Sequence, residues 1–118
     1  MLWPLKADID LSFLVGQKLI QIAIGLYQVQ FRFDQETTIS VEDCFTYERA
    51  EKKHCWKSGE LEKAGPVVEL VGGVVNAVLA RDSEVEIRFS NGSRLALGAE
   101  PSALESFMIR HRGGLMVV

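Results

Sequence analysis

Alternating apolar and polar positions mark two strands of this chain most clearly. In residues 27–34 the odd positions are apolar and the even ones are polar, which is the period of two that a half-buried strand requires. The same alternation returns in residues 84–89. Ser90-Asn91-Gly92-Ser93 follows this second strand, and Asn-Gly favours a hairpin with a type I′ turn. The pattern therefore predicts that residues 85–89 and 93–97 pair antiparallel.

These two strands belong to a longer correspondence within the chain. Residues 14–41 align with residues 70–97 at a constant offset of 56 without gaps, and apolar pairs such as Ile22 with Val78 and Ile39 with Leu95 keep the same phase. Each copy is predicted to contain a short helical turn, a glycine that ends it (Gly16 and Gly72), and three strands. The first strands, at 18–24 and 74–80, are apolar on both faces, which favours central positions in a sheet. We interpret the correspondence as an internal duplication.

The predicted fold class is mainly β. Two similar three-stranded antiparallel meanders, at about 14–41 and 70–97, are expected to cover each other's apolar faces as a small sandwich or half-open barrel. The whole chain, 1–118, is expected to be a single domain. For the tail at 101–118 both a helix and a hairpin fit residues 101–110, and we favour a C-terminal hairpin.

The segment between the two copies is the least regular part of the sequence. Ile39, Val41, Phe45 and Tyr47 keep one phase, which predicts a long or bent third strand. A charge-rich stretch follows, and we interpret residues 48–65 as an exposed excursion, for which a hairpin that closes through His54-Cys55-Trp56 is one form.

Composition narrows the class of protein. The chain has 118 residues, 47% hydrophobic and 25% charged, with a formal net charge of −3, so it is long enough to bury one core and lacks the broad positive field of nucleic-acid binders. The N-terminus does not fit a signal peptide, and glutamines and a lysine interrupt the most apolar window, 13–31, which argues against a membrane helix. We expect a cytoplasmic protein whose two cysteines remain thiols.

Several motifs resemble a family of short bacterial proteins of unknown function. They are Gly25-Leu26-Tyr27-Gln28-Val29-Gln30-Phe31-Arg32-Phe33-Asp34, Leu70-Val71-Gly72, Phe89-Ser90-Asn91-Gly92-Ser93, Glu100-Pro101 and Gly113-Gly114-Leu115. The resemblance covers roughly residues 10–118, although this chain ends without the Pro-Gly-Gly motif of many members. It implies a fold pattern with a duplicated β unit, and it implies no activity, cofactor or functional residue.

Metal and catalytic sites find little support in the residue spacing. Cys44, His54, Cys55 and His111 are all the soft metal ligands of the chain, but they lack the paired spacing of structural zinc sites, and neighbouring residues of a strand point to opposite faces. No catalytic motif is present in the sequence. We therefore expect no catalytic residue, no metal and no cofactor.

Aromatic residues inside the charged excursion suggest a contact surface instead. Tyr47, His54 and Trp56 are the interaction candidates, because exposed aromatics with a polar rim are typical of protein contacts; alternatively, Trp56 folds back as a lid on the core. The leading hypothesis is a non-enzymatic binding protein of the bacterial cytoplasm that forms a homodimer or caps a protein partner, for example as an immunity-type protein. The alternative is a small-molecule binder or minor enzyme with a cleft between the two β units.

Overall fold

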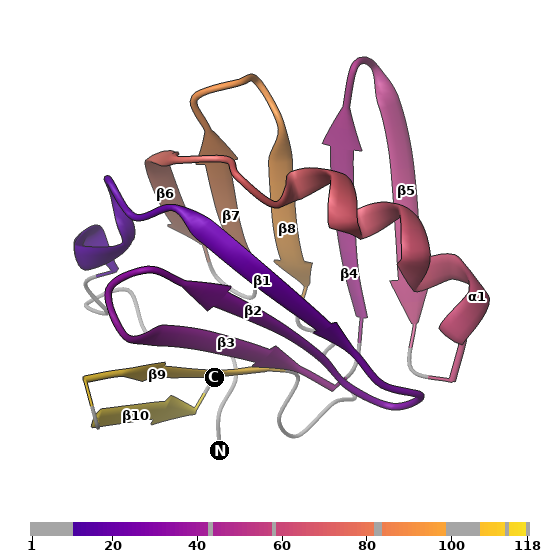
Figure 1. Ribbon diagram of the computed structural model, residues 1–118, viewed down its shortest axis with the longest axis horizontal. Helices are drawn as coiled ribbons and strands as arrows, with labels where there is room; N and C mark the ends of the chain where they lie inside the picture. Colours follow the sequence, from indigo (N-terminus) through magenta and orange to yellow (C-terminus); the bar gives the residue numbers. More distant parts are fainter. Residues whose placement is uncertain are drawn as a thin grey trace.

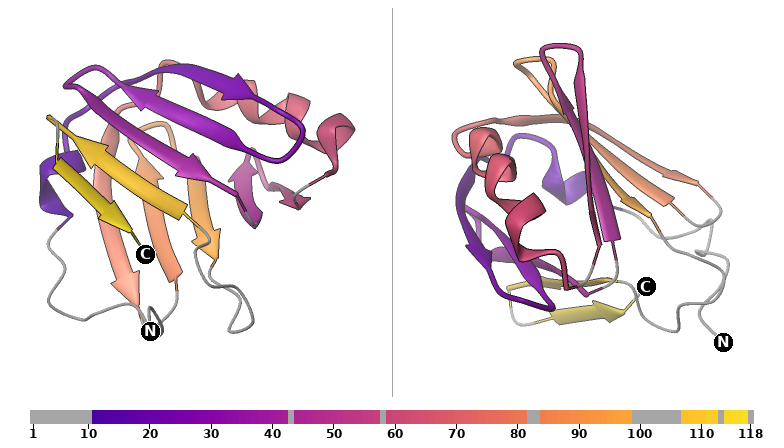
Figure 2. Two further views of the ribbon diagram at one scale, coloured as in Figure 1. Left: turned by 90° about the horizontal axis from the view of Figure 1, so that it is seen from below. Right: turned by 90° about the vertical axis from the view of Figure 1, so that its right-hand side faces the viewer.

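The computed structural model describes residues 11–42, 44–57, 59–81, 84–98, 107–112 and 114–117. Two five-stranded antiparallel sheets face each other in a mainly β sandwich, which confirms the predicted fold class and decides against the barrel (Figure 2). The first sheet contains, in spatial order, β1 (Leu19–Ile24), β2 (Val29–Phe33), β3 (Thr37–Val41), β9 (Phe107–His111) and β10 (Gly114–Val117). The second contains β5 (Lys52–Lys57), β4 (Cys44–Arg49), β8 (Arg94–Gly98), β7 (Glu84–Phe89) and β6 (Val75–Arg81).

The meanders β1–β2–β3 and β6–β7–β8 match residue for residue at the offset of 56. Ile22 lies opposite Phe31 in the first, and Val78 opposite Ile87 in the second. Even the irregularities coincide, since the register of β1 shifts at Ile20 and that of β6 at its counterpart Asn76. The two meanders are therefore similar in geometry, whereas their origin by duplication stays a prediction.

Reciprocal backbone hydrogen bonds join the two meanders where they begin. The amide of Gly16 donates to the carbonyl of Val75 at 2.8 Å, and the amide of Gly72 donates to that of Leu19 at 2.7 Å. Both glycines follow a 3-10 turn, η1 (Ser12–Leu14) or η2 (Gly65–Leu70), and have φ near +95° (91° and 98°), a conformation that glycine adopts without steric cost. The bonds relate the two halves by an approximate two-fold axis.

The hairpins that follow the meanders are exchanged between the sheets. The hairpin β4–β5 follows β3 in the chain but pairs with β8, and the hairpin β9–β10 follows β8 but pairs with β3 (Figure 1). The prediction of one long or bent third strand is thus wrong, because the chain leaves the first sheet after Val41 and enters the second at Cys44. The C-terminal hairpin is confirmed from Phe107 onward, while residues 101–106 lie outside the described part.

Two further expectations are corrected by the sheet order. The strands predicted to be central, β1 and β6, lie at sheet edges; some of their apolar side chains face the core and others remain on the surface. The segment 48–65 contains the hairpin that the sequence suggested, because β4 and β5 pair in an antiparallel register that includes His54, Cys55 and Trp56; this hairpin is part of the second sheet, so the prediction of an exposed excursion is wrong. The remainder of the segment forms a short helix, α1 (Leu61–Ala64), that leads into η2.

The turn at 90–93 confirms the predicted hairpin but not its type. Of its residues only Gly92 has a positive φ, 92°, whereas a type I′ turn needs two. In the first meander the equivalent residue is Glu36, with φ of 57°. A residue with a Cβ is strained in this left-handed region by about 1–2 kcal/mol.

This pair of turns provides a matched stability test. We expect Glu36→Gly to raise the free energy of unfolding by about 1 kcal/mol, because glycine removes the strain, and we expect Gly92→Ala to lower it by a similar amount. Urea unfolding of the two variants measures both effects. Equal changes of the same sign in both would contradict the equivalence of the two turns.

Candidate functional site

Two of the three residues predicted to form a contact surface belong to the core. Trp56 is 0% and Tyr47 2% exposed. The indole of Trp56 stacks on Phe45 with ring centroids 5.1 Å apart. The hypothesis that Tyr47 and Trp56 are exposed contact residues is therefore wrong, and the lid alternative for Trp56 describes its position better.

The burial of Tyr47 has an electrostatic consequence. Among the described residues its hydroxyl has no hydrogen-bond partner, and its ring stacks on His54 at a centroid distance of 4.7 Å. Burial raises the pKa of Tyr47 to about 12, and the negative charge of Glu69 adds to the increase. The phenol is therefore neutral over the whole physiological range.

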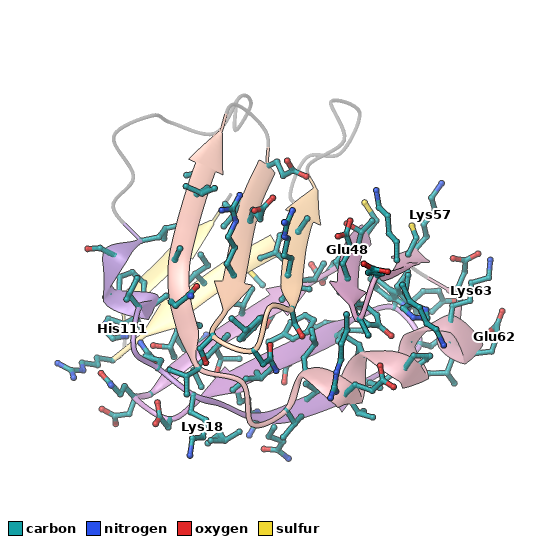
Figure 3. The ribbon with its side chains drawn as sticks, turned by 90° about the horizontal axis from the view of Figure 1, so that it is seen from above. Lys18, Glu48, Lys57, Glu62, Lys63 and His111 are labelled. Carbon is teal, nitrogen blue, oxygen red and sulfur yellow. The ribbon has the colours of Figure 1, made fainter. Side chains whose placement is uncertain are left out.

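The weak metal-ligand candidates are distributed over the molecule. His54 and Cys55 are neighbours on β5; His54 packs against Tyr47, while Cys55 is exposed. His111 lies on β9 of the other sheet, where it stacks on Phe13, and Figure 3 shows it at the end of the molecule opposite to Lys57 of β5. Within the described residues, no three His, Cys, Asp or Glu side chains gather into a group that could hold a metal ion.

The space between the sheets, where a ligand cleft was predicted, is filled by apolar side chains. Both sheets contribute to one buried cluster, together with Leu14 of η1 and Leu70 of η2. A binding site is therefore better sought on the surface of the sandwich.

Exposed apolar side chains concentrate along one edge of the first sheet. η2 runs beside β1, whereas α1 contacts β5 (Figure 1); the turn that follows β1 is tied to the start of the α1–η2 segment by a hydrogen bond from the Gly59 amide, just before α1, to the Leu26 carbonyl, 3.0 Å long. We define the β1 flank as the exposed large apolar residues of β1, this turn and the segment up to residue 71: Ile20, Leu26, Tyr27, Leu61, Val68 and Val71. Tyr27 and Ile20 are the most exposed, at 64% and 53%.

The two-fold relation supplies an internal control for this surface. At the offset of 56 the flank residues Ile20, Leu26, Tyr27 and Val68 correspond to Asn76, Asp82, Ser83 and Ser12, whereas Leu61 and Val71 correspond to the apolar residues Leu5 and Val15. The two halves therefore differ in polarity at these four positions, and large exposed apolar side chains gathered on one surface are typical of an interaction site.

The edge strands also differ in charge. Leu19–Ile24 contains no charged residue and no proline, whereas β5 carries three lysines and β6 ends in Arg81. Charged edges resist pairing with another chain, and an uncharged edge permits it. From Ile20 onward, β1 has β2 as its only strand neighbour within the described structure.

In comparison with known proteins, no family model, no curated protein and no solved structure matches this chain. The resemblance to a family of short bacterial proteins stays a prediction. Among the described residues there is no helix with the length and apolar character needed to cross a membrane.

Proposed function

We propose that this chain is a non-catalytic binding protein that forms a homodimer through the β1 flank. The observation that carries the proposal is the contrast between the halves, since polar residues stand opposite Ile20, Leu26, Tyr27 and Val68, four of the six flank residues, at the equivalent positions of the other half. Exposed aromatic and aliphatic side chains beside an unpaired edge strand are typical of interfaces formed by strand addition.

A second copy fits this edge for an electrostatic reason. In a two-fold antiparallel pairing, β1 of one copy lies against β1 of the second copy, so each residue of β1 meets a β1 residue of the partner. A strand with lysines would bring like charges together, as β5 would, whereas the neutral residues of β1 do not repel each other. The pairing would join the two first sheets into one continuous sheet and remove apolar side chains of both flanks from water.

Sedimentation equilibrium on matched variants tests the proposal. We expect the wild type to sediment at twice the 13.2 kDa chain mass. The triple variant Ile20→Asn, Leu26→Asp, Tyr27→Ser carries the residues that stand at the equivalent positions of the other half, so it is expected to fold and to remain a monomer. Val15→Ser, at an exposed valine outside the flank, is expected to remain a dimer.

Thermal unfolding of the same samples shows whether each variant is folded, so a loss of dimerisation can be distinguished from a loss of folding. A wild type that stays monomeric as the concentration rises would refute the homodimer. A folded triple variant that still dimerises would place the interface elsewhere.

A further inference from the structure

A second surface, independent of the β1 flank, is a polar groove on the outer face of the first sheet. It has a volume of about 280 Å³ and is formed over β2, β3 and β9. We name it the arginine groove; its lining residues are Gln28, Gln30, Arg32, Thr38, Ser40, Met108 and Arg110. Six of these seven can donate a hydrogen bond through a guanidinium, amide or hydroxyl group.

Two unneutralised cations lie in one row across the groove. Arg32 is opposite Thr38, and Thr38 is opposite Arg110, so the Cα atoms of the two arginines are about 10 Å apart, two strand spacings. The lining includes no carboxylate. Arg32 donates to the side-chain oxygen of Gln30 at 3.4 Å, and neither arginine forms an ion pair with a described residue.

The equivalent face of the second sheet differs in its charges. There Arg88, the counterpart of Arg32, is paired with Glu86, which takes the place of Gln30. Arg94 is the counterpart of Thr38 at the offset of 56. Its neighbour on the next strand is Glu48, whereas the neighbour of Thr38 is Arg110. A carboxylate therefore stands where the first sheet has its second arginine. The groove on that face is smaller, about 120 Å³. The second sheet thus pairs Arg88 with a carboxylate and places another carboxylate opposite Arg94, whereas the lining of the arginine groove includes no carboxylate.

We propose that the arginine groove binds a small molecule through an oxyanion, either a carboxylate or a phosphate. A guanidinium presents a planar fork of N–H donors that matches both groups and can bind them through two parallel hydrogen bonds. The hydroxyls of Thr38 and Ser40 and the amide groups of the two glutamines supply further donors from neighbouring strands. A volume of about 280 Å³ is close to that of small-molecule sites and suits a small metabolite.

Calorimetric titration at constant ionic strength tests this site with two probes, citrate for carboxylates and inorganic pyrophosphate for phosphates. We expect at least one probe to bind wild-type protein, and the double variant Arg32→Gln, Arg110→Gln to bind it at least about tenfold more weakly, since two charge-assisted contacts are lost. The matched control Arg88→Gln, Arg94→Gln on the second sheet removes the same charge and is expected to stay within about twofold of the wild type. The probe that binds more tightly identifies the ligand class.

Two results would overturn the proposal. If neither probe binds the wild type, the groove is a solvated strand face. If both double variants lose the same affinity, binding reflects the overall charge and not the groove. Thermal unfolding of both variants verifies that they are folded, and because all of these substitutions lie outside the β1 flank, the result does not depend on dimerisation.

Discussion

Replacing Trp56 by alanine is expected to lower the free energy of unfolding by about 3–5 kcal/mol, the range for truncating a large buried aromatic side chain. The indole is fully buried and stacks on Phe45, so alanine would leave a cavity between the edge strand β5 and the core. Phe45 in turn meets Phe31 of the first sheet edge to face, at a centroid distance of 5.3 Å. Trp56 therefore helps to fasten the exchanged hairpin to both sheets, and urea unfolding measures the loss.

The control for this prediction is Trp56→Phe. The indole nitrogen is buried and has no hydrogen-bond partner in the described part of the chain, so phenylalanine removes an unsatisfied polar group while it keeps most of the apolar volume. We expect a clearly smaller loss than for alanine. A Trp56→Ala variant as stable as the wild type would mean that the indole is not in the core.

The second large effect is expected at alkaline pH and concerns Tyr47→Phe. The folded-state pKa of Tyr47 is about 12, against an ordinary value of 10.0. Below pH 10 the phenol is protonated in both the folded and the unfolded chain, so the full free energy of unfolding is present. As the pH rises from 10 to 12, the unfolded chain releases the proton while the folded chain retains it. The contribution of Tyr47 to the free energy of unfolding is therefore lost across this window. The wild type is expected to lose about 2 kcal/mol across this window from Tyr47.

Parallel urea titrations at pH values from neutral to 12 test whether the free energy of unfolding falls as the pH rises above 10. The Tyr47→Phe variant lacks this contribution, so its stability is expected to fall less steeply above pH 10. At neutral pH the variant should be as stable as the wild type or slightly more so, because the lost hydroxyl has no hydrogen-bond partner. Identical alkaline slopes for the two proteins would show that the phenol is accessible to water.

The alternating residues were sufficient to predict the meanders but not the path between them. Positions 39, 41, 45 and 47 are all apolar and all buried, as expected for a single strand. In a sandwich both sheets face the same core, so a chain that crosses from one sheet to the other can keep its apolar phase. The sequence pattern therefore could not reveal that the hairpins are exchanged.

Local residue patterns also misplaced the edge strands and the contact residues. Apolar residues on both faces of β1 suggested a central strand, whereas part of them belongs to the exposed β1 flank. On β5 only Trp56 is a large apolar residue among lysines, His54 and Cys55, and it is the one buried residue of the strand, so the surrounding charge concealed that Trp56 faces the core. The flank itself could have been found from the sequence by asking where the two aligned units differ in polarity.

The central claim, that β1 is an interface strand, is tested most directly by amide hydrogen exchange at increasing protein concentration. We expect exchange within Leu19–Ile24 to slow as dimers form, because strand pairing protects edge amides from water, while exchange in the lysine-bearing edge strand Lys52–Lys57 stays constant. Exchange in β1 that is as fast at high as at low concentration would contradict the proposed dimer.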